Sequence, residues 1–174
     1  MREIDGNLIT LAQQGHFDVI THGCNCFCTM GAGIAPQMAK AFGCNTFEME
    51  HPKYQGDINK LGTINFQSGA VVDKVFKNWL YSDANSENDI KLTVINSYTQ
   101  YNYGRNHLDG DKSPVDYDAI TMCMQKINHI FRGKTIGLPK IGAGLAGGDW
   151  GRIKKIIETE LNAMDVIIVY YDKK

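Results

Sequence analysis

The chain has almost no net charge and no long hydrophobic run. Its 18 Lys and Arg residues nearly balance its 19 Asp and Glu residues, which gives a formal net charge of −1. Without a broad basic field, no extended nucleic-acid surface is expected. No stretch approaches the roughly 18 apolar residues of a membrane span, and residues 1–5 do not resemble a signal peptide. We therefore expect a cytoplasmic protein that does not bind membranes.

The usual signatures of enzymatic nucleophiles are also missing. No arginine follows a cysteine at the spacing of a phosphatase loop, and there is no Gly-x-Ser-x-Gly motif. A complete P-loop pattern is absent as well. If the protein breaks a bond, these absences favour attack by a positioned water molecule.

The chain has five cysteines, an odd number that fits reduced thiols better than a disulfide framework. His22, Cys24, Cys26 and Cys28 alternate along the chain, which suggests a zinc site. However, alternate residues of a strand lie about 6.5–7 Å apart, farther than tetrahedral thiolate ligands. We therefore expect buried thiols, with no metal and no other cofactor.

The hydrophobic pattern predicts one α/β domain over residues 1–174, with helices flanking a mixed sheet. Breaks between the early strands are expected at Ser68-Gly69 and at Lys77-Asn78. The predicted helices are 33–42, 116–131 and 150–164. The predicted strands are 17–22, 63–66, 70–76, 79–81, 91–97, 135–138 and 166–171.

Two glycine-rich turns each follow an apolar strand-like run and precede a helix-like run. The first is His22-Gly23-Cys24-Asn25, followed shortly by Met30-Gly31-Ala32-Gly33-Ile34-Ala35, and the second extends from Leu138 to Trp150. Glycines at such a junction allow backbone N–H groups to approach an anion, and the start of the helix adds a partial positive charge. Two such junctions in one small domain predict a cleft that holds a diphosphate from both sides.

The second turn also matches the dinucleotide fingerprint, as Gly142-x-Gly144-x-x-Gly147. Only 27 residues follow Gly147, too few for the second half of a dehydrogenase fold. The glycines therefore indicate contact with phosphate in a different fold.

Together, the two loops resemble those of macrodomains, the ADP-ribose-binding family. The resemblance covers nearly the whole chain, and the loops at 22–35 and 138–150 carry it. It is closest to the small macrodomains described as ADP-ribose 1″-phosphate phosphatases, whose first loop also reads His-x-Cys-Asn-Cys before Gly-x-Gly-Ile-Ala. The resemblance implies a three-layer α/β/α sandwich with a mixed central sheet.

The resemblance also implies a ligand-binding set. The two glycine loops would enclose the diphosphate and the distal ribose, and Asn25 would bind that ribose. Tyr170 would stack on adenine, and Asn7 stands where many members carry an aspartate that reads the adenine amino group. The implied set is Asn7, Leu8, Cys24, Gly31, Ala32, Gly33, Ile34, Ala35, Ile141, Gly142, Ala143, Gly144, Leu145 and Tyr170.

The candidate catalytic residues are His22, Asn25 and Asp149, and each has a structural alternative. His22 is either a proton shuttle or a strand-end histidine bonded to a backbone carbonyl. Asn25 also fits an Asx turn, and Asp149 also fits the N-cap of the following helix. Tyr170 in turn fits simple packing.

The resemblance implies that the protein is a monomer that binds ADP-ribose or ADP-ribose 1″-phosphate. Its expected reaction is hydrolysis of the latter to ADP-ribose and phosphate. The alternatives are a non-catalytic ADP-ribose reader and a hydrolase that removes ADP-ribose from modified protein or nucleic acid. The glutamate-directed branch relies on a lysine and on an aspartate directly after Gly-x-Gly-Leu. Here Ala146 follows Leu145, and residues 96–99 contain no lysine.

Overall fold

The computed structural model describes residues 1–78, 89–104 and 114–171. Within them, a mixed seven-stranded sheet has the order β1-β7-β6-β2-β5-β3-β4. Five neighbouring strands are mutually parallel, namely β1, β7, β6, β2 and β5. Strand β3 runs antiparallel to both of its neighbours, β5 and β4. The strands are β1 Arg2–Asp5, β2 Val19–Asn25, β3 Ile64–Val72, β4 Val75–Asn78, β5 Ile90–Gln100, β6 Thr135–Leu138 and β7 Asp165–Tyr170.

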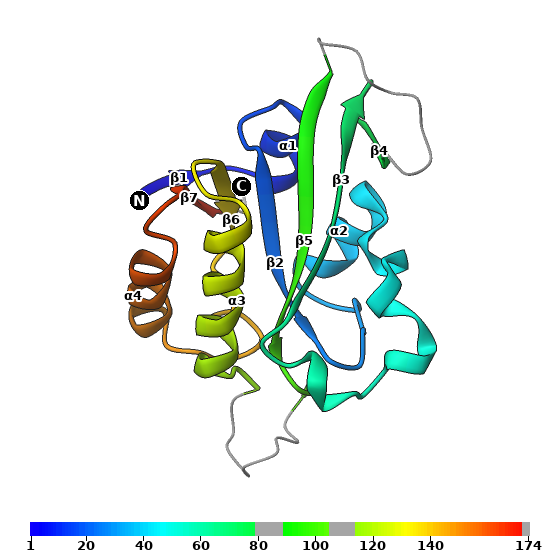
Figure 1. The fold of residues 1–174 in the computed structure, drawn as a ribbon, viewed down its shortest axis with the longest axis vertical. Helices are drawn as coiled ribbons and strands as arrows, with labels where there is room; N and C mark the ends of the chain where they lie inside the picture. Colours follow the sequence, from blue (N-terminus) through cyan, green and yellow to red (C-terminus); the bar gives the residue numbers. More distant parts are fainter. Residues whose placement is uncertain (79–88, 105–113, 172–174) are drawn as a thin grey trace.

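Helices cover both faces of this sheet (Figure 1). One buried cluster joins α3 and α4 to the sheet, and a second joins α1 and α2 to its other face. These two layers confirm the predicted α/β/α sandwich. The helices are α1 Leu8–Gln13, α2 Ala35–Phe42, α3 Tyr117–Ile130 and α4 Trp150–Glu160. Four short 3-10 turns lie between α2 and β3, at Cys44–Thr46, Glu48–Glu50, Pro52–Tyr54 and Ile58–Lys60.

The predicted break at Ser68-Gly69 is wrong, because β3 runs unbroken through it. A Cβ atom on Gly69 would lie 2.3 Å from the carbonyl oxygen of Lys77, so this glycine permits close approach of β4. The chain reverses instead at Asp73 and Lys74, whose φ angles of 51° and 66° are typical of a two-residue hairpin turn. The predicted strand 79–81 lies outside the described residues.

The predicted helices 33–42 and 116–131 correspond to α2 and α3. Helix α2 ends at Gly43, which has a φ of 66° and donates its N–H to the Ala39 carbonyl. Helix α4 ends at Glu160, earlier than the predicted Met164. Helix α1 was not predicted; its first turn is capped by Asn7.

Strands β7, β6, β2 and β5 are parallel, so their carboxyl ends meet at one edge of the sheet. Both glycine-rich loops leave the sheet at this edge, since one follows β2 and the other follows β6. In α/β folds, ligands bind outside the carboxyl ends of such strands. None of the helices in the described residues is long and apolar enough to cross a membrane.

Candidate functional site

A cleft of about 1150 Å³ opens at the carboxyl ends of these four strands. Most of the predicted binding residues line it, and they come from the two glycine loops, the start of α1 and the end of β7. Three predicted residues, His22, Ala143 and Asp149, are not part of the lining. The predicted residues in the lining are Asn7, Leu8, Cys24, Asn25, Gly31, Ala32, Gly33, Ile34, Ala35, Ile141, Gly142, Gly144, Leu145 and Tyr170.

The first glycine loop leads into a helix whose first turn has no side-chain cap. Ile34 occupies the N-cap of α2, and its apolar side chain accepts no hydrogen bond from the N–H groups of the first turn. The other three α-helices of the described residues are capped by Asn7, Asp116 and Asp149. Within the described residues, the backbone N–H groups of 31–35 have no acceptor. Free N–H groups and the helix dipole therefore face the cleft together, which suits an anion.

The second glycine loop is braced from within. Gly147 donates its N–H to the Gly144 carbonyl at 3.0 Å, and Gly148 donates to the Gly142 carbonyl at 2.9 Å. Gly142 has a φ of 71°, and a Cβ there would lie 3.0 Å from Val115. The N–H groups of Gly144 and of the following residue have no acceptor among the described residues. The loop therefore presents fixed donors from the side opposite α2.

Among the described lining residues, Lys140 is the only one with a charged side chain. Its Nζ lies 5.6 Å from the ring centroid of Trp150 and 6.0 Å from that of Tyr170. No described aspartate or glutamate lines the cleft. The lining therefore favours an anionic ligand and offers no carboxylate for proton transfer.

Tyr170, at the end of β7, is held by two hydrogen bonds. Its hydroxyl donates to Glu3 Oε2 at 2.9 Å and accepts from Trp150 Nε1 at 3.2 Å. Asn7 lies nearby in the lining, and its Oδ1 accepts the N–H groups of Ile9 and Thr10. The side-chain oxygen of Asn7 is therefore already used to cap α1.

Asn25, the last residue of β2, organises the start of the first loop. Its Oδ1 accepts the N–H groups of Phe27 and Thr29 at 3.0 and 3.2 Å, and its Nδ2 donates to the Thr29 carbonyl at 3.0 Å. These bonds include an Asx turn. One amide hydrogen of Asn25 remains for a ligand, so the residue can hold both the loop and the ligand.

His22 lies inside the sheet, below the cleft. Its side chain is fully buried, and Nε2 lies 2.8 Å from Asn96 Oδ1. The sulfur atoms of Cys24 and Cys44 lie 3.7 and 3.6 Å from Nε2. Burial lowers the His22 pKa from 6.5 to about 4, against the opposing effect of the Asn96 hydrogen bond. The imidazole is therefore neutral at physiological pH and has no contact with the cleft.

Asp149 occupies the N-cap of α4, where its Oδ1 accepts the Arg152 N–H at 3.1 Å. This is the structural alternative that the sequence offered for the residue. Because Asp149 is outside the lining, the structure provides no contact between its carboxylate and the cleft.

The five cysteines are free thiols, and burial determines their chemistry. It raises the pKa of Cys26 and Cys44 to about 12, and that of Cys24 well above its ordinary range. These thiols are therefore protonated at neutral pH and are poor nucleophiles. Among the described residues, no group of three His, Cys, Asp or Glu side chains could hold a metal ion.

The lining also contains residues that were not predicted, among them Gly23, Thr99, Gln100 and Lys140. Lys140 lies within the second glycine-rich turn, and that position was the signal for it. Thr99 and Gln100 end β5, whose pairing with β2 brings them beside Cys24 and Asn25. Sequence alone did not show that these two strands are neighbours.

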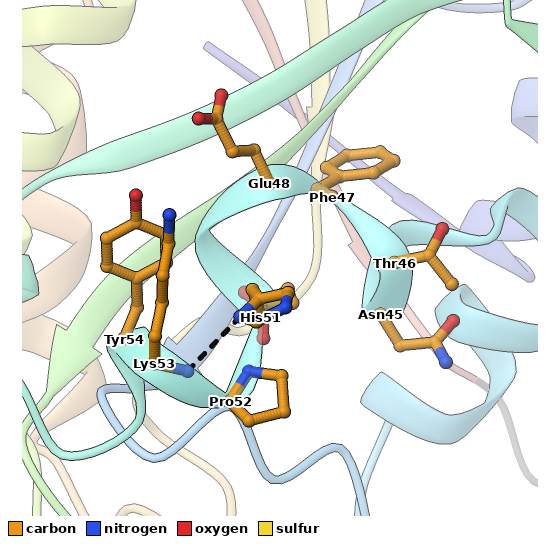
Figure 2. Close-up of a pocket in the computed structure, with 9 residues that line it drawn as sticks. Asn45, Thr46, Phe47, Glu48, His51, Pro52, Lys53 and Tyr54 are labelled. Carbon is orange, nitrogen blue, oxygen red and sulfur yellow. Dashed lines mark hydrogen bonds between the residues drawn. The ribbon is translucent and has the colours of Figure 1, made fainter.

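A second hollow, of about 340 Å³, is lined by residues 45–48 and 50–54 (Figure 2). The Lys53 backbone N–H donates to His51 Nδ1 at 3.2 Å. Figure 2 draws this hydrogen bond as a dashed line. The hollow is formed within one run of 3-10 turns and includes none of the predicted site residues. The larger cleft is therefore the candidate site.

The fold matches that of macrodomains. The macrodomain of Thermus aquaticus DarG is 20% identical, with a TM-score of 0.59, and the match covers 98% of this chain and 97% of that one. Thermosipho africanus DarTG, solved in complex with ADP-ribose, is 14% identical with a TM-score of 0.66. That match covers 99% of this chain and 42% of the longer protein. The chain therefore has the macrodomain fold.

Its sequence is also related over nearly its whole length to a phage protein. The uncharacterized 17.5 kDa protein in the tk-vs intergenic region of Enterobacteria phage T4 is 33% identical over 179 residues. The match covers 99% of this chain and 97% of the phage protein. No protein-family model matches the chain.

Proposed function

We propose that this macrodomain binds ADP-ribose in the cleft and hydrolyses ADP-ribose 1″-phosphate to ADP-ribose and phosphate. The observation that carries the proposal is the uncapped first turn of α2. It faces the cleft together with the free N–H groups of 31–35, while the second loop supplies donors from the other side. This arrangement suits a pyrophosphate, and the DarTG complex with ADP-ribose supports the same ligand class.

In the proposed binding mode, adenine lies at the Tyr170 end of the cleft. Lys140, beside Tyr170, adds a positive charge on that side. The pyrophosphate lies between the two glycine loops, and the distal ribose reaches Asn25. The His-x-Cys-Asn-Cys and Gly-x-Gly-Ile-Ala sequences of the first loop support the phosphatase assignment within the family.

For the chemical step, we propose that water attacks the 1″-phosphorus, and the bond from phosphorus to the ribose oxygen breaks. Neither His22 nor Asp149 reaches the cleft, and no described lining residue is a carboxylate or a histidine. The proton of the water therefore passes to an oxygen of the substrate's own phosphate and then to the leaving ribose oxygen. The protein contributes positioning and N–H donors that stabilise the developing charge.

The test is inorganic phosphate release from purified protein and ADP-ribose 1″-phosphate, with ribose 5-phosphate as a control for a contaminating phosphatase. We expect release from the first compound only, and slower release with Asn25→Ala. Binding of ADP-ribose without phosphate release would show a reader instead of this enzyme. Absence of ADP-ribose binding would contradict the whole proposal.

A further inference from the structure

Thr99, on the floor of the cleft, has a buried hydroxyl without a hydrogen-bond partner among the described residues. The residue is fully buried, and its Oγ1 has no hydrogen-bond partner within the described residues. Buried hydroxyls are normally bonded, because leaving one unpaired destabilises the fold. Thr99 nevertheless lines the cleft, so the exception occurs where a ligand can supply the missing partner.

The backbone around Thr99 is irregular in a way that affects this side chain. Cys24 of β2 pairs with Tyr98, and the next residue, Asn25, pairs with Gln100. Thr99 is therefore the extra residue of a bulge in β5. Bulges re-aim side chains and are frequent beside functional sites.

Gly23 leaves room for the Thr99 side chain. A Cβ atom on Gly23 would lie 2.8 Å from Thr99 Oγ1 and 3.3 Å from Ile141 Cγ1. All three residues line the cleft, so Thr99 lies on its floor where β2, β5 and the second glycine loop meet. Any larger residue at position 23 would fill this part of the floor.

The sheet order places Thr99 far from the adenine end. Tyr170 ends β7, and β6 and β2 separate that strand from β5. Three inter-strand steps correspond to about 14 Å. A ligand that reaches Tyr170 with its base therefore brings its opposite end, the distal ribose and its substituent, toward Thr99 and Asn25.

We propose that the Thr99 hydroxyl donates a hydrogen bond to the phosphate on the distal ribose and thereby distinguishes ADP-ribose 1″-phosphate from ADP-ribose. This inference rests on the proposed function. The whole Thr99 side chain is covered in the free protein, so the proposed bond requires the floor of the cleft beside Gly23 and Ile141 to open when the phosphate binds. Rotation about the Cα–Cβ bond by one staggered position, about 120°, then moves the hydroxyl to the place of the methyl group or of the Cβ hydrogen. The bond to a charged phosphate oxygen then replaces the partner that the free protein lacks.

The test compares Thr99→Val, which removes only the hydroxyl, with Thr99→Ser, which keeps it. For Thr99→Val we expect kcat/KM toward ADP-ribose 1″-phosphate to fall by about tenfold or more, as for loss of a hydrogen bond to a charged group. The Kd for ADP-ribose should change less than about twofold, which is below the effect of one hydrogen bond. Thr99→Ser should recover most of the lost kcat/KM.

Stability separates this role from a structural one. Thr99→Val should not lower the urea midpoint, because its hydroxyl has no partner to lose. Thr93→Val is the matched control on the same strand: Thr93 Oγ1 lies 2.8 Å from Ser68 Oγ, so its loss should lower the midpoint and leave kcat/KM unchanged.

The outcomes distinguish the two proposals. Unchanged kcat/KM in Thr99→Val, with an active wild type, would overturn the role of Thr99 and leave the proposed function standing. A lowered urea midpoint in Thr99→Val, as in Thr93→Val, would also overturn it by showing a structural hydroxyl. No phosphate release by the wild type would contradict the proposed function itself.

Discussion

Gly33 and Leu145 face each other from the two glycine loops: a Cβ atom on Gly33 would lie 3.9 Å from Leu145 Cδ1. The Leu145 side chain is 77% exposed. The two loops therefore approach each other at the cleft, and a side chain at position 33 would enter the space between them.

This geometry predicts that Gly33→Val blocks ligand binding. Gly33 has a φ of 65°, and Gly133 has a φ of 76° with no atom within 4 Å of its Cβ position. Valine at either position should cost about 1–2 kcal/mol of stability from left-handed backbone strain. Only Gly33→Val should also weaken ADP-ribose binding, by at least about tenfold, because one blocked N–H donor to phosphate is worth that much. Calorimetry and urea unfolding of both variants measure the difference; equal affinities would contradict it.

Lys140→Met tests the charge of the cleft. Removing the only charged side chain in the described lining should weaken ADP-ribose binding about fivefold at low salt, and less at high salt, where charges are screened. Lys155→Met removes the same charge from an exposed position on α4, outside the lining. It should leave binding unchanged. The measurement is Kd as a function of ionic strength. An equal loss of ADP-ribose affinity in both variants would contradict the prediction, because it would show an effect of net charge and not of the position of Lys140.

The lowered pKa of His22 predicts how the stability of the folded protein depends on pH. Its pKa is lowered from 6.5 to about 4 in the folded protein, so the neutral ring contributes stability above pH 6.5. That stability is lost as the pH falls from 6.5 toward 4, and amounts to about 3 kcal/mol. Urea unfolding across this range should show the loss in the wild type and a shallower loss in His22→Gln. The exposed His16 provides the control, and His16→Gln should keep the wild-type slope.

Tyr98→Phe tests the buried polar cluster beneath the first loop. The Tyr98 hydroxyl donates to Glu50 Oε1, and Lys60 Nζ lies 4.5 Å from the Tyr98 ring centroid. Losing the hydroxyl removes a donor from a carboxylate that is 7% exposed, and should cost about 1–3 kcal/mol. Tyr103→Phe, at a 56% exposed position, should change the unfolding free energy by less than about 0.5 kcal/mol. Similar losses in the two variants would contradict the role of the cluster.

The sequence was most informative where one local signal determines the structure. Gly43 ends α2, Asp116 begins α3 and Asp149 begins α4, each by its own backbone or side-chain preference. The glycine loops could be predicted for the same reason, since a strand, a turn and a helix follow one another in the chain.

The remaining features depend on neighbours that are distant in sequence. Gly69 was interpreted as a break between strands, but it lies within β3. A glycine is needed there because the carbonyl group of Lys77 on β4 approaches it closely. The role of His22 could not be decided from the alternation of polar and apolar residues, because β2 is buried on both faces. The hydrogen-bond partner of His22 is Asn96, which lies on β5. Thr99 was missed because its bulge exists only in the pairing of β2 with β5.

The most direct test of the account is an ADP-ribose titration followed through the backbone amide NMR resonances of the glycines. We expect saturable shifts for Gly31, Gly33 and Gly144, whose N–H groups face the cleft without acceptors, and no shift for Gly133 at the opposite edge of the sheet. Unmoved cleft glycines at saturating ADP-ribose, or shifts no larger than that of Gly133, would contradict the account.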